Sequence, residues 1–245
     1  MRFLVLLPVL KNEELEVSTR QELDQLRTRD LSFDVESLEF GPSSVESEYD
    51  ERLASPLILE KVATAERAGY DAVFISCTDD VALSAAREVA TIPVVAPLEV
   101  SVLVASTLGR KFSILAVLRS EIPVFWRRLR EYGAIDQLAS IKSIDIPVLE
   151  LDSKREEVVR SLTSKAKEAI EQDDADTIIL GCTGMTGMAN EIQKSVGVPV
   201  IDPVLVSIKY AELLVASDLT HSKRAYPTPS KKERKSPYEI RKEII

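Results

Sequence analysis

Two cysteines are the residues of this sequence best suited to chemistry at carbon, and each is followed directly by a threonine. They are Cys77 and Cys182, followed by Thr78 and Thr183. A thiolate can remove a proton from a carbon atom and a thiol can return one, so the pair could act on opposite faces of one carbon. The single histidine, His221, lies near the C-terminal end. A Cys-His dyad, a Ser-His-Asp triad or a histidine-rich metal site is therefore not expected in the body of the chain.

The segments that contain the two cysteines are copies of one pattern. Residues 71–78 match residues 176–183 without a gap, and residues 92–97 match residues 198–203. Two copies of one βα unit can pack around a pseudo-twofold axis, which brings equivalent residues face to face. A cysteine beside an apolar strand is, taken alone, most simply a small buried hydrophobe. The equivalence of the two cysteines favours a functional pair instead.

Both cysteines are predicted just past the carboxyl end of a strand and just before a helix, where open α/β sheets bind ligands. A thiol at a helix N-terminus lies at the positive end of the helix dipole, which predicts a pKa low enough for a thiolate near neutral pH. The threonines that follow, Thr78 and Thr183, have two interpretations. They either cap the helices or donate a hydroxyl to an oxygen of a substrate.

A glycine-rich stretch, Gly181–Gly187, surrounds the second cysteine. Glycines three residues apart allow backbone amides to approach an anion closely. The spacing differs from the dinucleotide fingerprint, so a carboxylate or an imide anion is a better match than a pyrophosphate. Gly184 and Met185 are the substrate-contact candidates here, although core packing is the simpler interpretation of the Met185 side chain.

Short apolar runs alternate with amphipathic segments along the whole chain, which is typical of an α/β fold with parallel sheets covered on both faces. One helix is predicted from its punctuation, with Ser55 as cap, Pro56 at the first helical position and Gly69 at the end. The strands are expected at residues 3–7, 72–76, 112–118 and 177–180.

The net charge of −9 combines an acidic body with a basic C-terminal segment, since residues 221–245 hold eight Lys or Arg and three Glu. An acidic body argues against nucleic acid as a partner, because phosphate binding needs a positive surface. We interpret the apolar residues 1–10 as a strand rather than a signal peptide, and no other apolar run approaches the length that crosses a bilayer. A cytoplasmic protein with reduced thiols is expected, with no membrane partner.

At these motifs the sequence resembles the aspartate/glutamate/hydantoin racemase superfamily, from about residue 2 to residue 218. The paired Cys-Thr motifs and the segments Leu180–Met185 and Val198–Pro203 are the most specific marks. Gly41–Ser47 resembles the hydantoin racemase branch. So do Tyr49–Glu51, Ala86–Glu88 and Glu99.

The resemblance implies two pseudo-symmetric flavodoxin-like halves with the active site in the cleft between them, and a homo-oligomer. The first half would comprise residues 1–97 and 205–220, the second residues 98–204, followed by a basic extension over residues 221–245. The implied reaction is racemisation of 5-substituted hydantoins or related heterocycles by two-base proton transfer, without cofactor or metal. Cys77 and Cys182 would be catalytic, and the substrate-binding candidates are Asn12, Ser43, Thr78, Asp79, Thr183, Gly184 and Met185.

The chain also departs from the family pattern. The hydantoin branch usually carries Asn-Pro-Asn after its first strand, where this chain has Pro8–Asn12, so Asn12 or Lys11 is the candidate replacement and a solvated loop is the alternative. After Cys77 the family tends to show Asp-Pro-Gly, whereas this chain has Asp79–Val81.

Other functions stay open from the sequence. Decarboxylation of a malonate or isomerisation of maleate on the related fold is one class, although the paired cysteines favour two-sided proton transfer. Racemisation of aspartate or glutamate would need cations for a second carboxylate, for which Lys11, Arg87 and Arg119 are the candidates. A binding module that closes over a small acid or heterocycle would use neither cysteine.

Overall fold

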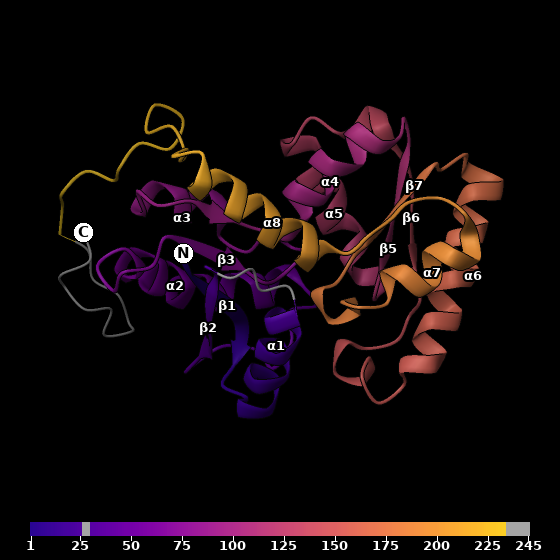
Figure 1. Ribbon diagram of the computed structural model, residues 1–245, viewed down its shortest axis with the longest axis horizontal. Coiled ribbons are helices and arrows are strands. Elements are labelled where there is room, and N and C mark those ends of the chain that lie inside the picture. The colour runs from indigo at the N-terminus through magenta and orange to yellow at the C-terminus, as the bar shows by residue number, and fades with distance from the viewer. Residues whose placement is uncertain (26–29, 234–245) are drawn as a thin grey trace.

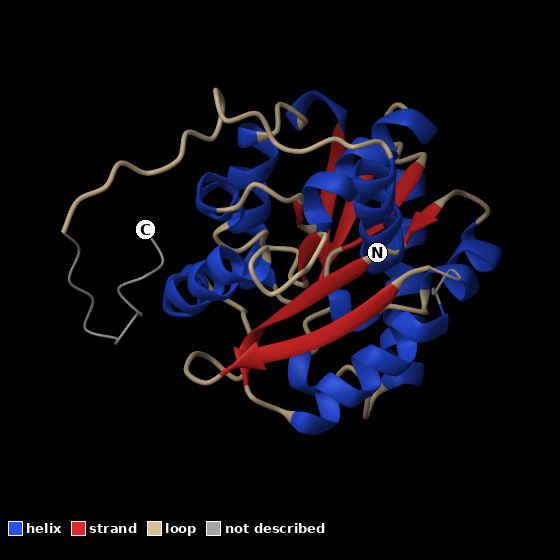
Figure 2. Cartoon of the chain, turned by 60° about the vertical axis from the view of Figure 1, so that its left-hand side comes forward, coloured by secondary structure: helices blue, strands red, loops and turns tan. Residues whose placement is uncertain are grey.

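Two four-stranded parallel sheets organise the protein in the computed structural model, which describes residues 1–25 and 30–233. The strand orders are β2-β1-β3-β4 and β6-β5-β7-β8, so the second sheet repeats the order of the first. Helices cover the sheets, and the two halves lie side by side (Figure 1, Figure 2). The predicted α/β fold with two similar halves is confirmed. The strands are β1 (Arg2–Leu10), β2 (Ser32–Leu38), β3 (Ala72–Ile75), β4 (Val94–Val95), β5 (Phe112–Ala116), β6 (Leu138–Ser143), β7 (Thr177–Leu180) and β8 (Val200–Ile201).

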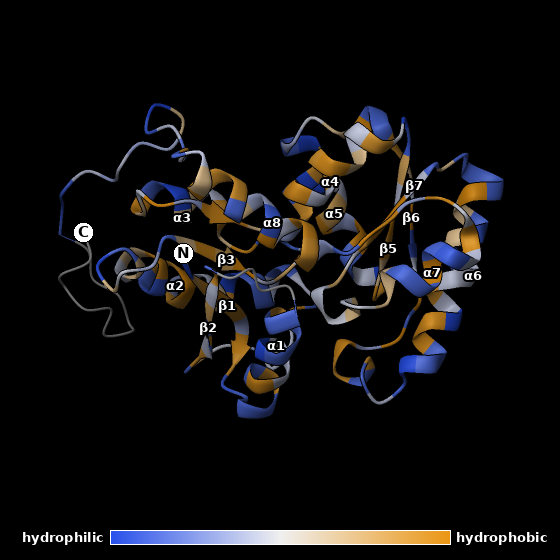
Figure 3. Ribbon diagram, in the orientation of Figure 1, coloured by the Kyte–Doolittle hydropathy of each residue, from blue (hydrophilic) through white to orange (hydrophobic). Residues whose placement is uncertain are grey.

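The central strands are buried because their residues are apolar nearly throughout. Every residue of β3, β5 and β7 is buried. The repeat extends to the register, since Phe3 pairs with Ala72 in the first sheet and Phe112 pairs with Thr177 in the second. Apolar residues concentrate on the sheets and on the helix faces that cover them (Figure 3). The carboxyl ends of β3 and β7, where the cysteines follow, therefore rest on rigid elements.

The predicted helix start at Ser55 and Pro56 is wrong. Ser47 is the N-cap, its side chain accepting a hydrogen bond from Asp50 N, and Pro56 lies inside the helix. A proline removes one helical hydrogen bond, but the apolar face of this helix packs against the first sheet and compensates for it. The α-helices are α1 (Glu13–Gln25), α2 (Glu48–Ala65), α3 (Leu83–Val89), α4 (Pro97–Leu108), α5 (Ile122–Glu131), α6 (Arg155–Asp173), α7 (Ala189–Val196) and α8 (Pro203–Ala216).

Two helices are exchanged between the halves. α4 follows the first sheet in sequence, yet Leu98 and Val102 pack with Phe112 of the second sheet. α8 follows the second sheet, yet Val204 and Ile208 pack with residues of β1 and β3. α8 accordingly extends from the centre of the molecule over the first half, while α4 lies on the second half (Figure 1). Each hydrophobic core is therefore completed by a helix from the other copy of the repeat.

The segment after α8 packs on the first half. Thr220 Oγ1 donates to Thr91 O, and His221 Nε2 lies 3.0 Å from Val94 N. Lys223 Nζ donates to three carbonyls at the C-terminal end of α3, those of Arg87, Glu88 and Ala90. In the part of the chain described, no helix is long and apolar enough to span a membrane. The predicted basic extension lies outside the described residues from position 234 onward.

Candidate active site

A cavity of about 520 Å³ lies between the two halves and is lined by both cysteines. The first half contributes the end of β1, the start of α1 and the loop after β3. The second half contributes the loop after β7 and the turn at Val148–Leu151. Both cysteines are free thiols and half-buried. The cavity therefore presents one thiol from each copy of the repeat.

Six of the seven predicted substrate contacts line this cavity, and Met185 does not. The side chain of Met185 is fully buried in the core of the second half, as its apolar character favours. Asn12 lines the cavity, but its Oδ1 accepts hydrogen bonds from Glu14 N and Leu15 N and so caps α1. The residues brought together are Asn12, Ser43, Thr78, Asp79, Thr183 and Gly184.

The sequence predicted both cysteines at the N-termini of α-helices, and the structure contradicts this prediction. After Cys77 the chain makes irregular turns, and α3 begins only at Leu83. After Cys182 it makes a short 3₁₀ turn, and α7 begins only at Ala189. The local amides that remain are Gly184 N, which donates to Cys182 Sγ at 3.4 Å, and the backbone amide of Asp79, whose hydrogen bond lowers the pKa of Cys77. The helix dipole is therefore too distant to stabilise either thiolate.

The prediction of a thiolate near neutral pH is wrong for the same reason and for two more. Burial raises the pKa of Cys77 well above its ordinary value, and the charge of Asp79 raises it further. Burial raises the pKa of Cys182 to about 12, with Glu121 as the next cause. Low polarity and negative neighbours both disfavour an additional anion. These shifts make the thiolate form of each cysteine a small fraction at neutral pH.

The two threonines connect the cysteine loops to each other. Thr78 Oγ1 donates to Gly181 O at 2.5 Å, and Thr183 Oγ1 donates to Ser76 O at 3.3 Å. Each hydroxyl thus binds the carbonyl that precedes the opposite cysteine, as a pseudo-twofold axis requires. These contacts are not helix caps, and a contact of the threonines with a substrate stays a prediction. The threonines fix the two cysteine loops relative to each other.

One aspartate in each half connects the cysteine loop to the N-terminus of the second α-helix after it, which is α4 in the first half and α8 in the second. Asp80, in the first loop, accepts hydrogen bonds from Leu98 N and Glu99 N at the start of α4. Asp202, the N-cap of α8, accepts from Gly187 N in the second loop and from Val204 N. Both halves thus connect a cysteine loop to a helix N-terminus. The carboxylate belongs to the loop in the first half and to the helix N-cap in the second.

Two buried carboxyl groups face the cavity, and the sequence singled out only one of them. Burial raises the pKa of Asp79 to about 8, and in the described structure its Oδ2 has no hydrogen-bond partner. Burial also raises the pKa of Glu121 to about 7, although Val117 N and Leu118 N donate to it. Its position shortly after the carboxyl end of β5 is the signal that could have identified Glu121. Near neutral pH Asp79 is largely protonated and Glu121 about half protonated, so each can donate a hydrogen bond from its protonated form.

The charged side chains along this cavity are all acidic in the described structure, with neither Lys nor Arg among them. The remaining lining is mostly apolar or hydroxylic. The acidic members are Glu14, Glu22, Asp79, Glu121 and Asp152.

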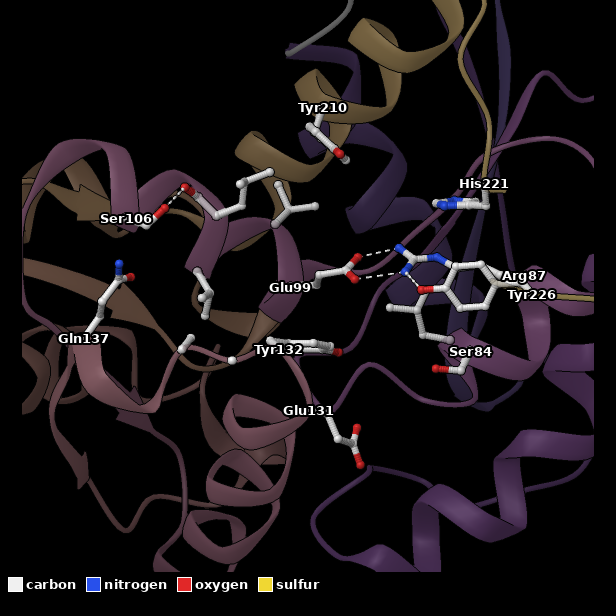
Figure 4. A pocket seen from close by; sticks show the side chains of 16 residues that line it. Ser84, Arg87, Glu99, Ser106, Glu131, Tyr132, Gln137, Tyr210, His221 and Tyr226 are labelled. Carbon is white, nitrogen blue, oxygen red and sulfur yellow. Dashed lines mark hydrogen bonds and ion pairs between the residues drawn. The ribbon is translucent and has the colours of Figure 1, made fainter. Parts of the chain in front are cut away.

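A second cavity, of about 660 Å³, contains neither cysteine and lies near α3, α4 and the segment after α8 (Figure 4). Arg87, one of the cations considered for a substrate carboxylate, belongs to this cavity. Its guanidinium forms two hydrogen bonds to the carboxylate of Glu99 and a third to the hydroxyl of Tyr226. Arg87 is therefore engaged within the protein and remote from the thiols.

The family model that matches this chain describes a racemase family, and similar proteins include hydantoin and allantoin racemases. The family model described as Asp/Glu/Hydantoin racemase matches residues 13–211. A hydantoin racemase of Pseudomonas sp. (strain NS671) is 38% identical over 198 residues, covering 80% of each chain. The structure is similar to that of an allantoin racemase from Klebsiella pneumoniae, with a TM-score of 0.90 at 28% identity and 97% of each chain covered. An allantoin racemase from Pseudomonas fluorescens gives a TM-score of 0.91 at 28% identity, covering 96% of this chain and 100% of that one.

Proposed function

This chain belongs to the Asp/Glu/hydantoin racemase family and is a racemase, and from that premise we propose that it racemises 5-substituted hydantoins by passing protons between Cys77 and Cys182. The observation that carries the proposal is the cavity between the halves, which takes one thiol from each copy of the repeat. Two-sided proton transfer needs an acid and a base on opposite faces of a planar intermediate. Membership of a racemase family argues against a non-catalytic binding module.

The proposed reaction begins from the small fraction of protein in which one cysteine is a thiolate. The thiolate forms an S–H bond as the C5–H bond of the hydantoin breaks, and the electron pair passes into the adjacent carbonyl to give an enolate. The opposite S–H bond then breaks as a C–H bond forms on the other face. The second cysteine is left as the thiolate. Because a raised pKa makes a thiolate rarer but more basic, the pair suits a weakly acidic C–H bond.

Protonated carboxyl groups support the enolate in this proposal. The enolate oxygen gains negative charge, which donors aimed at it stabilise. Asp79, with a pKa of about 8 and an unpartnered Oδ2, can donate from its protonated form. Glu121 faces the same cavity with a pKa of about 7.

The charge of the cavity supports a neutral heterocycle over a free acidic amino acid. A second carboxylate on the substrate would meet acidic side chains, and the described lining offers no Lys or Arg to bind it. Of the three cations considered, Arg87 pairs with Glu99, while Lys11 and Arg119 are absent from the lining. A buried unpaired carboxylate is strongly unfavourable.

The apolar part of the lining supports a hydrocarbon substituent at C5. Leu7 and Leu23 come from the first half, and Val148, Leu149 and Leu151 from the second. Burial of a substituent against such side chains contributes roughly 25 cal/mol for each Å² removed from water. Allantoin, whose C5 substituent is a polar ureido group, gains less from this wall.

The test compares single enantiomers of 5-benzylhydantoin, allantoin, aspartate and glutamate in deuterium oxide. Polarimetry follows racemisation and proton NMR follows exchange at the stereogenic carbon. The hydantoins are expected to racemise and exchange, 5-benzylhydantoin fastest, and both amino acids to do neither. Cys77→Ala and Cys182→Ala are each expected to abolish racemisation, while Ser84→Ala, in the second cavity, retains it. Full activity in both cysteine variants contradicts the two-thiol mechanism, and reaction of an amino acid alone contradicts the substrate class.

Two further properties are part of the proposal, a cytoplasmic location and a homo-oligomeric state. The free thiols support a reducing compartment. Light scattering after size-exclusion chromatography measures the oligomeric state directly, and a mass near 27.2 kDa would contradict oligomerisation.

A further inference from the structure

The loop that carries Cys77 has an unfavourable backbone conformation. Within this Cys77 loop (residues 77–82), Asp80 has φ 49° and Ala82 has φ 55°, and neither is glycine. Left-handed conformations of such residues are rare and persist where the surroundings hold them in place. Asp80 N donates to Cys77 O at 3.0 Å, so the strained turn and the cysteine are directly connected.

The groups that hold this turn come largely from the opposite half. Arg128 of α5 donates from Nε to Asp79 O at 2.8 Å and from Nη2 to Asp80 O at 3.3 Å. Tyr132, the residue after α5, donates its hydroxyl to Asp80 Oδ2 at 2.6 Å. One helix end of the second half thus donates to two carbonyls and to the carboxylate of the Cys77 loop, in addition to Leu98 N and Glu99 N of α4, which donate to the same carboxylate.

Arg128 is itself fixed in place by a buried ion pair across the two halves. Its Nη2 lies 2.7 Å from Glu51 Oε1, and the side chains of Arg128 and Glu51 are 13% and 3% exposed. Arg127 binds the other oxygen of Glu51 at 2.8 Å. Among the described residues, the Arg127 guanidinium donates to Glu48 and Glu51 and makes no hydrogen bond to the Cys77 loop. Two adjacent arginines therefore share one carboxylate, and Arg128 also donates hydrogen bonds to the Cys77 loop.

The Cys182 loop is supported differently. Apart from the threonine contacts, its hydrogen bonds come from its own half, with Gly181 N donating to Leu115 O and Gly187 N to Asp202 Oδ2, both at 2.8 Å. Arg155, which donates to Gly187 O, also belongs to the second half. Arg128 consequently acts on one of the two cysteines.

We propose that Arg128 is a positioning residue for Cys77: from the second half it holds the Cys77 loop so that this thiol faces the cleft. The inference rests on the proposed two-thiol function. Loss of Arg128 should impair proton transfer at Cys77 and leave transfer at Cys182 intact. A residue that only stabilised the contact between halves would impair both transfers alike.

The test measures substrate isotope effects on kcat/KM with 5-benzylhydantoin deuterated at C5, starting from each enantiomer in turn. When one cysteine is impaired, the isotope effect rises in the direction in which that cysteine removes the substrate proton and falls in the other. Cys77→Ser and Cys182→Ser define the two opposite patterns. Arg128→Ala is expected to lower kcat/KM on the order of tenfold to a hundredfold and to shift the isotope effects in the Cys77→Ser sense.

Arg127→Ala is the matched control, because it removes an ion pair to the same Glu51. Its isotope effects should stay as in the unmodified enzyme. Arg128→Lys, which keeps the charge but loses the forked donor geometry, should give a smaller shift in the same sense and serves if Arg128→Ala does not fold. Unchanged isotope effects in a folded Arg128 variant, or a shift in the Cys182→Ser sense, overturn the inference. If the two serine variants do not shift in opposite senses, the two-thiol function itself fails.

Discussion

Replacement of Asp79 by asparagine should change how the stability of the protein depends on pH. Burial raises the pKa of Asp79 from 3.8 to about 8 in the folded protein. Between these values the folded state holds a proton that the unfolded state has released. The free energy of unfolding therefore falls as pH rises through this window, and the loss is complete above the folded pKa.

The magnitude follows from linkage and does not require the exact pKa. A carboxyl that is protonated in the folded state and ionised in the unfolded state changes stability by about 1.4 kcal/mol per pH unit. Between pH 5 and pH 7 the ionisation of Asp79 alone thus contributes a loss of about 3 kcal/mol. Asp80 and Glu121, whose pKa values burial raises to about 7, contribute in the same direction.

Urea unfolding followed by circular dichroism at pH 5, 6 and 7 measures the effect. For Asp79→Asn the free energy of unfolding should fall less steeply with pH, by up to about 1.4 kcal/mol per unit. Asp136→Asn, at an exposed position between α5 and β6, is the control and should follow the unmodified protein. Parallel profiles for Asp79→Asn and the unmodified protein would refute the view that Asp79 is protonated in the folded state.

Three further outcomes are expected. The racemisation rate should increase from pH 5 to pH 7, by up to about tenfold per unit, because the raised pKa values of Cys77 and Cys182 keep thiolate scarce while Asp79 is still largely protonated. A rate that is flat over this range contradicts those pKa directions. Thr78→Val should lower kcat more than it raises KM, because it removes the hydroxyl that donates to Gly181 O. Thr78→Ser keeps a hydroxyl and should restore kcat. Steady-state kinetics measure kcat and KM for both variants. Lys223→Ala should lower the free energy of unfolding by about 1–3 kcal/mol in urea, because three carbonyls lose a charged donor. The racemisation rate of the folded variant should be unchanged. A reduced rate in the folded variant would contradict a purely structural role for this contact.

The repeat made the fold and the pairing of the cysteines predictable, because equivalent strands place equivalent residues at the same end of each sheet. Residues 71–78 and 176–183 needed no tertiary information to be matched, and the family model and relatives confirm the resemblance. The division into two domains and the individual site roles stay predictions. The domain division and the site roles depend on which surfaces of the two halves pack together, and a single sequence does not show this.

What the sequence misjudged was local structure that tertiary contacts decide. The Cys77 loop was predicted to lead directly into a helix, but Asp80 adopts a left-handed conformation that Arg128 and Tyr132 hold from the opposite half. Burial between the halves raises the pKa of both thiols, and the pKa of Cys182 also depends on Glu121, which no sequence spacing connects to it. Pro56 taken alone is typical of a helix start. The structure places it inside α2, because the apolar face of this helix packs against the first sheet.

The exchange of α4 and α8 bears on how such an enzyme could arise. A single ancestral copy of the repeat, paired with an identical subunit, would already oppose two thiols across a symmetric cleft, and its last helix would cross to the partner as in a domain-swapped dimer. Fusion of two such genes would turn that swap into the crossover seen in one chain. The two sides would then be free to diverge, as the different supports of Cys77 and Cys182 have done.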